Sequence, residues 1–484
     1  MYRDSISLND YAGLNGFGWS NTQEVNELTK ALSAGYAADP SQMTGGAALR
    51  VESLEASLKV VTFTNRHIKF WKKIPKSPAY STVEEFNVLS QYGNERAFGF
   101  TREGELPPSQ DSTFSRQTAL VKFIGTTRTV THQMTLVNPA HGDVIALENQ
   151  NGILWLLERV EDSLFHGNSA LSFSGESTQW DGLDTLIDST SIIDLEGQPL
   201  QESVIEEASN QVIEQFGYPT DLFLGTRAMS DLVKTFYPRE RVQLPAPADG
   251  KVGLSINTMA TQAGVIEFNP DVFIKKGNTP PALATSNNAP GTPVAAIAAA
   301  AGAGTANWAK SFGTGFAGNQ VVEYAVTACN RFGESAPAFT GIANGTISAA
   351  QLDDSRQVEI TNAAAGTNAA EYFIVYRRDA GVGGAASLDL SLYSEVGRIA
   401  TTSQAAGVAA ATFQDLNTIM PGTEMAYLGE LTPSVLTFRQ LAPLMKMDLA
   451  VLAPAYRWMI LMYGVPILFA PQKWVRLINV GRLS

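Results

Sequence analysis

A glycine-rich motif is the first stretch of the sequence that could bind a ligand. Gly313, Gly315 and Gly318 in GTGFAG have the spacing of a dinucleotide-binding loop. Such a loop needs a strand before it and a helix after it, because the helix N-terminus holds the phosphate. Here no apolar strand precedes the motif, and the following VVEYAVTA favours a strand. The motif therefore predicts no nucleotide site.

The remaining reactive side chains do not form a catalytic or metal-binding pattern. Cys329 alternates with apolar strand residues, which favours a buried, inert thiol. There is no G-x-S-x-G elbow and no Walker loop, and no acidic pair stands in a general acid–base arrangement. We expect no catalytic residues, no cofactor and no metal. The histidines lie in different elements without ligand spacing: His67, His132, His141 and His166.

Composition narrows the class of protein. The chain has 484 residues, 44% of them hydrophobic, and a net charge of −13. The charge argues against a general nucleic-acid binder, although it is compatible with a protein that lies near DNA without binding to it. A single cysteine excludes a disulfide framework and favours a cytoplasmic origin. The N-terminus lacks a signal peptide, and the apolar run 456–471 is too short for a membrane span. We interpret that run as two buried strands joined by a turn.

Residues 143–167 are predicted to form one long amphipathic helix of about 35 Å. Asp143 lies in the first turn, where the helix dipole favours negative charge. Gly167 follows the last apolar position, where a left-handed cap is usual. The acidic side chains Glu148, Glu158 and Glu161 are expected to face solvent or a neighbouring subunit. The apolar face recurs at helical spacing: Val144, Leu147, Leu154, Leu157, Val160 and Leu164.

Residues 80–135 precede this helix and are predicted to form a long β-hairpin. Its second arm, FSRQTALVKFIGTTRTVTHQMTL, is rich in Thr, Val, Phe and Ile. An isolated hairpin is only marginally stable, so we expect it to rest on a neighbouring subunit. The candidate contact residues are Phe98, Phe100, Arg102, Glu103, Glu105, Phe114, Arg116, Lys122, Phe123 and Arg128.

The rest of the chain alternates between mixed and β-prone regions. Residues 198–236 suggest a helix, the short buried strand DLFLG and a second helix over 227–236. Residues 285–307 are rich in Ala, Gly and Pro and are interpreted as a linker. Short β-prone runs then follow up to about residue 427 and indicate a small sandwich. The apolar segment after it is expected to complete the core left open near residue 280.

This order of elements resembles the HK97-fold major capsid protein of tailed bacteriophages, an α+β fold. The segments that carry the resemblance include DLEGQPLQESVIEEASNQVIEQFGYPTDLFLGTRAMSDL and LAPLMKMDLAVLAPAYRWMILMYGVP. The run EYAVTACNRFGESAPA likewise resembles a strand of Ig-like or fibronectin-type-III modules. The resemblance implies an N-terminal arm (1–50), a peripheral domain (51–200) with the extended loop 80–135 and the spine helix 143–167, an axial domain (201–280), an inserted Ig-like β-sandwich (281–427), and a C-terminal return (428–484).

The resemblance also implies a function and partners. The protein would self-assemble, as hexamers and pentamers, into the icosahedral head around double-stranded DNA. It would be a virion protein assembled in the bacterial host cytoplasm, with no membrane partner. Because the sequence has no helical scaffolding extension, a separate scaffolding protein is expected, beside a portal protein and a possible decoration or cement protein. The alternatives are an encapsulin-like nanocompartment shell, a soluble enzyme with an unrecognised site, and a β-sandwich adhesin.

Overall fold

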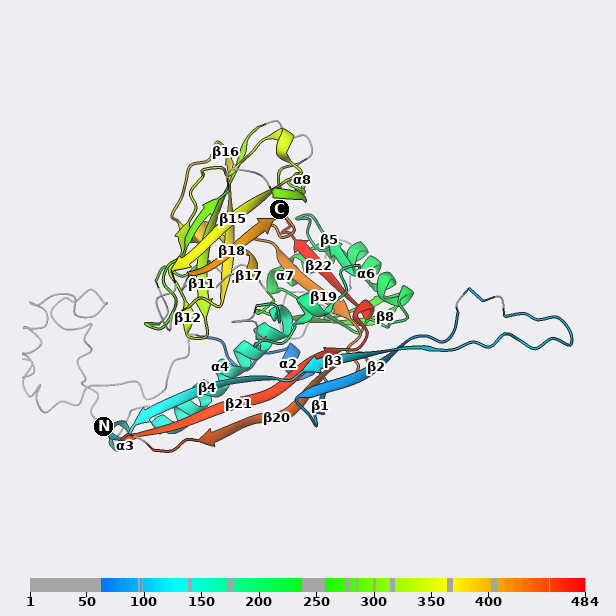
Figure 1. Ribbon diagram of the computed structural model, residues 1–484, viewed down its shortest axis with the longest axis horizontal. Coiled ribbons are helices and arrows are strands. Elements are labelled where there is room, and N and C mark those ends of the chain that lie inside the picture. Colours follow the sequence, from blue (N-terminus) through cyan, green and yellow to red (C-terminus); the bar gives the residue numbers. More distant parts are fainter. Residues whose placement is uncertain are drawn as a thin grey trace, which may run out of the picture. The chain divides into compact units, whose positions relative to one another are not determined.

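The computed structural model describes residues 62–94, 96–97, 99–137, 142–171, 178–236, 257–274, 279–283, 286–298, 302–313, 318–363, 369–401, 408–451 and 453–483. The predicted arm 1–50 and His141 lie outside these ranges. The chain forms two compact units (Figure 1). The described part of the smaller unit, within 129–150 and 451–456, contains α3 (His132–Leu136). There the His132 amide donates to the Pro454 carbonyl at 2.9 Å. The following paragraphs concern the larger unit and the helix α4.

The long helix is present as predicted. α4 spans Val144–His166, and the Asp143 carboxylate accepts a hydrogen bond from the Ile145 amide at its start. The left-handed cap predicted for Gly167 is wrong, because this residue does not have a positive φ. A Cβ on Gly167 would lie 2.4 Å from the Ser163 carbonyl oxygen and 2.5 Å from that of Trp180. Glycine is therefore needed here for the close approach of the following loop.

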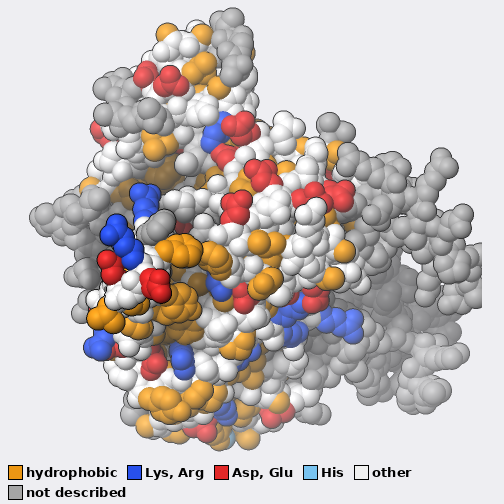
Figure 2. Space-filling model, turned by 90° about the vertical axis from the view of Figure 1, so that its right-hand side faces the viewer, with side chains coloured by type: hydrophobic (Ala, Val, Ile, Leu, Met, Phe, Trp, Pro, Cys, Tyr) orange, Lys and Arg blue, Asp and Glu red, His pale blue; other side chains and the backbone are white. Residues whose placement is uncertain are grey.

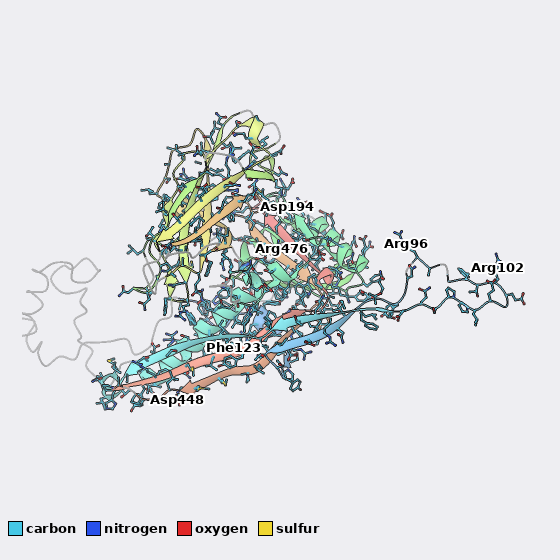
Figure 3. The ribbon with its side chains drawn as sticks, in the orientation of Figure 1. Arg96, Arg102, Phe123, Asp194, Asp448 and Arg476 are labelled. Carbon is cyan, nitrogen blue, oxygen red and sulfur yellow. The ribbon has the colours of Figure 1, made fainter. Side chains whose placement is uncertain are left out.

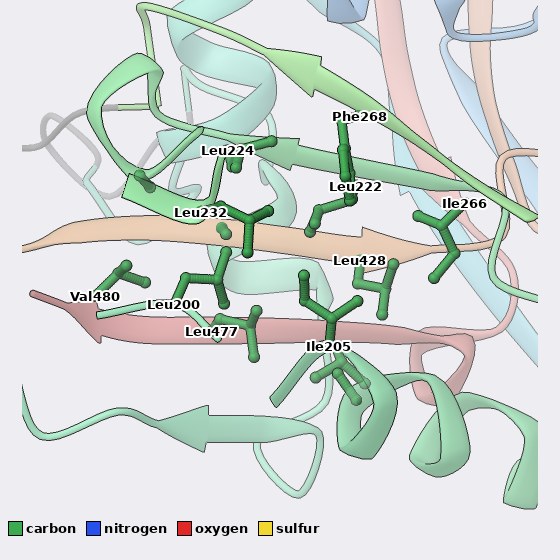
Figure 4. Packing of buried hydrophobic residues seen from close by; sticks show 14 of the residues in the cluster. Leu200, Ile205, Leu222, Leu224, Leu232, Ile266, Phe268, Leu428, Leu477 and Val480 are labelled. Carbon is green, nitrogen blue, oxygen red and sulfur yellow. The ribbon is translucent and has the colours of Figure 1, made fainter. Parts of the chain in front are cut away.

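A six-stranded mixed sheet, which we label the axial sheet after the axial domain predicted for residues 201–280, has the order β5-β22-β19-β6-β8-β7. α6 and α7 contribute to one hydrophobic cluster with its strands, which includes Leu222, Leu428 and Leu477 (Figure 4). The two helices and the strand between them were predicted. Phe216, expected on the α6 face, is 87% exposed instead. The bounds are β5 (Ile192–Asp194), α6 (Glu202–Glu214), β6 (Asp221–Leu224), α7 (Thr226–Phe236), β7 (Thr258–Thr261), β8 (Gly264–Pro270), β19 (Glu424–Gly429) and β22 (Trp474–Val480).

The opposite face of this sheet meets the C-terminal half of α4. Alternation along the strands turns Phe223 and Tyr427 away from the leucine cluster. The ring of Phe165, on α4, lies 5.4 Å from the Tyr427 ring and 6.2 Å from the Phe223 ring. The short helix α2 (Phe70–Lys73) adds Phe70, whose ring lies 4.9 Å from that of Phe165. Two further short helical turns are α5 (Leu183–Leu186) and η6 (Pro471–Lys473).

A four-stranded sheet has the order β1-β20-β21-β4. Its strands are β1 (Lys76–Pro78), β20 (Leu436–Asp448), β21 (Ala455–Leu468) and β4 (Lys122–Thr131). The apolar run 456–471 was predicted to hold two strands and a turn, and this is wrong, because β21 continues through Gly464 and Pro466. Gly464 lets the Phe438 ring of β20 approach, since a Cβ would lie 2.3 Å from that ring. The strand partners of β21 are β20 and β4, and neither lies within the run.

The predicted hairpin is divided between two sheets. β2 (Val83–Gln91) pairs antiparallel with β3 (Thr113–Leu120), and Val83 lies opposite Leu120. At Val121, which is buried, the second arm changes partner, and β4 joins the four-stranded sheet beside β21. Among the described residues between 92 and 112, there is no strand. The extended hairpin predicted from the sequence is thus present, but its base belongs to a larger sheet.

Residues 294–415 form two facing sheets. One contains β9 (Val294–Ile297), β10 (Gly302–Thr305), β15 (Asp354–Ala363) and β18 (Val408–Asp415), and the other contains β11 (Gln320–Asn330), β16 (Tyr372–Val382) and β17 (Ser394–Ala400) with the short β12 (Gly333–Glu334), β13 (Ala338–Phe339) and β14 (Thr346–Ile347). They share a core that includes Tyr324, Val358 and Phe373. The β-prone runs predicted between residues 318 and 418 form β11, β15, β16, β17 and β18. The short helices α8 (Ala309–Phe312), η3 (Ala349–Gln351) and η4 (Leu390–Leu392) complete this region.

Two expectations for this region need correction. The predicted linker 285–307 contains β9 and β10, because its small residues pair with β15 and so satisfy their backbone hydrogen bonds. β19 crosses the predicted boundary at residue 427, because it pairs with β6 and β22 of the axial sheet. The two sheets agree with the predicted all-β insert, whereas its Ig-like identity stays a prediction. The described fold combines helices with several separate sheets, and this confirms the predicted α+β class.

Candidate functional site

The residues that could do chemistry are placed apart from one another. A strand, β11, follows the glycine motif, so the motif lacks the helix that a nucleotide site requires. Cys329 is buried, and burial raises the pKa of its thiol well above the ordinary value, which disfavours the reactive thiolate. Among the described residues, no cluster of His, Cys, Asp and Glu could hold a metal ion. None of the described helices is long and apolar enough to span a membrane.

His166 belongs to a structural hydrogen-bond cluster. Its Nδ1 lies 2.8 Å from Asp184 Oδ2, and its Nε2 lies 3.2 Å from the Ile274 carbonyl oxygen. The same carboxylate accepts hydrogen bonds from the Tyr427 hydroxyl at 2.6 Å and from Arg476 Nη1 at 3.2 Å. All these groups have partners inside the fold, so the cluster joins α4, α5 and the axial sheet. It presents no group to a substrate.

A groove between β5 and α6 has a volume of about 660 Å³. It brings together no nucleophile and base of the kind that covalent catalysis requires. Its lining consists of Ile192, Ile193, Ser203, Glu206, Glu207, Asn210, Gln211 and Glu214.

The extended segment around residues 92–112 carries half of the predicted contact residues. Figure 3 shows Arg96 and Arg102 on this segment, well away from the sheets of the same unit. Phe100 and Leu106 are 81% and 93% exposed, and Arg102, Glu103 and Glu105 are also exposed. Phe98 lies outside the described residues. Tyr92, at the start of the segment, is 87% exposed as well.

Predicted contact residues on the strands at the base of this segment make contacts within their own chain. Arg116 pairs with Glu85 across the hairpin at 3.3 Å, and Phe114 remains 67% exposed. The Phe123 ring packs edge-on against Tyr463 at 4.8 Å. Lys122 and Arg128 are half-buried. The predicted contact residues therefore divide into an exposed group near the tip and a group near the base that has intramolecular neighbours.

Figure 2 views the molecule from the side on which this segment projects. Hydrophobic side chains gather in patches on this face, with lysine, arginine and acidic side chains between them. Surface ion pairs are worth only ~0–1 kcal/mol each. Burial of a phenylalanine by a neighbour is worth roughly 1.5–3 kcal/mol. The apolar residues of the hairpin should thus dominate any contact that it makes.

One buried acidic residue was missed. Glu161 was expected on a solvent-facing side of the long helix, yet it is fully buried. Its Oε1 accepts hydrogen bonds from the amides of Lys69 and Phe70, both at 2.7 Å, and its Oε2 accepts one from Trp71 at 2.8 Å. The contacting residues lie about 90 positions away in the sequence, so helical periodicity alone did not reveal them. Leu156, also absent from the predicted apolar face, is buried on the same helix.

The relatives described below all come from bacteriophages. No protein-family model matches the chain. It is 27% identical over 475 residues to a relative from Enterococcus phage phiEF24C, and the match covers 96% of each protein. It is 25% identical over 466 residues to the major capsid protein of Staphylococcus phage S25-3, and the match again covers 96% of each. The major capsid protein of Staphylococcus phage K matches at the same identity and coverage.

Solved structures with a similar arrangement are more distant in sequence. One from Gordonia phage Cozz has a TM-score of 0.45 and 9% identity, and the match covers 91% of this chain and 95% of that one. The holo-SrpI encapsulin complex from Synechococcus elongatus PCC 7942 has a TM-score of 0.36 and 10% identity, with 88% and 94% covered. The similarity in sequence along nearly the whole chain confirms the resemblance stated above: this protein is a homologue of the major capsid proteins of bacteriophages.

Proposed function

We propose that the protein is a major capsid protein, which self-assembles into the icosahedral head that encloses the double-stranded DNA of a tailed phage. The observation that carries this proposal is the full-length similarity to phage major capsid proteins. The exposed apolar hairpin supports it, because such a segment has a use only when another chain covers it. The function is structural and non-enzymatic, and the protein belongs to the virion capsid.

The hairpin is proposed as the principal contact between subunits. Its tip residues, from Phe100 to Leu106, would lie on an adjacent subunit, while β2 and β3 anchor it to its own chain. The residues 1–50 would form an arm along a neighbour. Each subunit would touch several others, and their combined burial would exceed the roughly 1,600 Å² of a standard interface.

Further partners follow from the proposed role and are themselves proposals. The shell would consist of hexamers and pentamers, with the axial sheet nearest the centre of each. A separate scaffolding protein would guide assembly in the host cytoplasm, and a portal protein would occupy one vertex. A decoration or cement protein is a further possible partner. The facing sheets of residues 294–415 would project outward.

The encapsulin-like alternative predicts a shell that is empty or filled with enzyme. The curated relatives favour the phage reading, because they are phage capsid proteins. Electron microscopy of the purified protein tests the proposal directly. Closed icosahedral particles are expected, and particles isolated from infected cells should contain DNA. A protein that stays monomeric under all assembly conditions, or particles that contain enzyme instead of DNA, would contradict it.

Charge reversal tests the hairpin contact. Glu103→Lys should reduce the yield of particles while leaving the unfolding of the free subunit unchanged, because this side chain is exposed. Glu359→Lys, at an exposed position of β15, is the matched control and should assemble normally. Equal particle yields from both variants would refute the contact assigned to Glu103.

A further inference from the structure

Two buried carboxyl groups meet where the short helix α2 docks against α4. Glu161 of α4 holds the first turn of α2 through the three amide hydrogen bonds described above. Asp271 follows β8 and is fully buried as well. Asp271 is close enough to Glu161 for the charge of Glu161, and a hydrogen bond with it, to raise the pKa of Asp271. Two ionised carboxylates in such a site would repel each other at low dielectric.

The hydrogen bonds of Asp271 show where a proton would reside. Its Oδ1 accepts the Phe273 amide at 2.9 Å. Its Oδ2 is buried and has no hydrogen-bond partner among the described residues. A buried oxygen without a partner costs about 1–3 kcal/mol. A proton on Oδ2 removes this cost, because the resulting hydroxyl can donate to the Glu161 carboxylate.

We propose that Glu161 and Asp271 share one proton and so form a pH-sensitive latch that fastens α2 and the segment after β8 to the long helix. Asp271 carries the proton and donates it to Glu161 in a hydrogen bond. Glu161 accepts this hydrogen bond in addition to those from three backbone amides. Loss of the proton would leave two negative charges in contact and release the first turn of α2. This inference does not depend on assembly and can be tested on the free subunit.

The charges around the pair are consistent with this assignment. Lys76 of β1 is close enough for its positive charge to interact with that of Glu161. From α2, only backbone amides face the pair: those of Lys69, Phe70 and Trp71. On α4, His166 faces Asp184 of α5 and the Ile274 carbonyl. On α2, the side chain of Lys73 faces Asp221 and Glu267. These neighbouring ion pairs are separate from the shared proton.

The direction of the pH effect follows from the environment. Burial, and then the charge of Glu161, raise the pKa of Asp271 to about 8. A group whose pKa is higher in the folded than in the unfolded state contributes stability at low pH. That contribution is complete below the unfolded pKa of 3.8 and is lost as the pH rises through about 8. The latch is therefore closed at neutral pH and opens in mild alkali.

Hydrogen exchange of the full-length free subunit tests the latch. After correction for intrinsic exchange rates, amides of residues 69–74 should exchange at least tenfold faster at pH 9.5 than at pH 6.5. Asp271→Asn should abolish this difference, because asparagine keeps the shape and an N–H donor toward Glu161. Asp448→Asn, at an exposed carboxylate paired with Lys446, should behave like the unmodified protein. An identical pH response in Asp271→Asn would overturn the proposal.

Infrared spectroscopy supplies a test that does not depend on whether a variant folds. The difference spectrum of the unmodified protein between pH 6.5 and 9.5 should show the loss of one protonated carboxyl band, far above the ordinary range for aspartic acid. Glu161→Gln should shift this loss to lower pH, because it removes the neighbouring negative charge. Absence of any protonated carboxyl at pH 6.5 would refute a shared proton.

Discussion

The axial sheet and the β2–β3 hairpin represent two different uses of apolar residues. In the axial sheet, leucines and aromatic residues are buried on both faces, by α6 and α7 on one and by α4 on the other. In the hairpin, Phe100, Leu106 and Phe114 are exposed although their chain includes large buried cores. The apolar residues of the sheet stabilise the subunit, whereas the exposed Phe100, Leu106 and Phe114 bury little of their area within it.

This difference suggests a separation of folding from assembly. A subunit whose hairpin residues are removed should keep its fold, because those residues bury little area within it. A subunit whose axial core is damaged should lose both the fold and assembly. Substitutions of matched size in the two regions therefore distinguish the two roles. The expected loss of subunit stability decreases from the axial sheet to the hairpin.

The largest effect is expected in the axial core. Leu222→Ala on β6 removes a fully buried side chain from the leucine cluster. It should lower the free energy of unfolding by ~2–5 kcal/mol, because both transfer and cavity contributions are lost. Denaturant unfolding of the free subunit measures this change. A loss below about 1 kcal/mol would mean that the cluster does not stabilise the subunit as its burial suggests.

A smaller loss is expected at the ion pair between α2 and the axial sheet. Lys73 Nζ lies 2.9 Å from Asp221 Oδ1 and 2.7 Å from Glu267 Oε2, and Asp221 is buried. Lys73→Met should cost about 1–3 kcal/mol, because it leaves the Asp221 carboxylate without its cation. The double variant with Asp221→Asn should recover part of the loss, as a double-mutant cycle would show. Strictly additive effects would contradict the pairing.

Phe114→Ala on β3 should separate stability from assembly. Because the side chain is 67% exposed, unfolding of the free subunit should change by less than ~0.5 kcal/mol. Particle yield at a limiting subunit concentration should fall about tenfold or more, as for an interface anchor. Phe332→Ala, at another exposed phenylalanine, is the control and should assemble normally. A loss of subunit stability without a loss of assembly would reverse the comparison.

The smallest effect is expected at the ion pair across the hairpin. Arg116 and Glu85 have side chains that are 68% and 53% exposed. Arg116→Gln should change subunit stability by no more than ~0.5 kcal/mol, because solvent screens exposed pairs. If assembly falls markedly while stability is unchanged, Arg116 also contacts a neighbour. Particle yields at low and high salt provide that measurement.

The elements with a strong local pattern were predicted well. The 23-residue helix α4, the two helices flanking β6, and the strands β11, β15, β16, β17 and β18 were expected from periodicity and composition. The exposed tip was also expected, because a long β-prone arm with Pro107 and Pro108 has no core of its own. These features depend on residues that are near one another in the sequence.

Errors arose where strand partners are remote. The run 456–471 suggested a turn at Gly464 and Pro466, yet β20 supplies a partner that keeps β21 extended. The alanine-rich segment near residue 295 suggested a linker, yet β15 pairs with β9. Neither composition nor spacing reports which backbone will lie alongside. The contact roles of the hairpin residues stay predictions, because they depend on a second chain.

The sequence by itself determined the helix that spans Val144–His166, the β-prone character of its neighbours and the resemblance to capsid proteins. Only the tertiary structure decided the environment of that helix. Glu161, which periodicity placed toward solvent, is buried because the amides of residues 69–71 and the carboxyl group of Asp271 converge on it. Periodicity is a property of adjacent turns, whereas burial depends on segments about 90 or more residues apart. For that reason the acidic pair was invisible in the sequence and became apparent only in the fold.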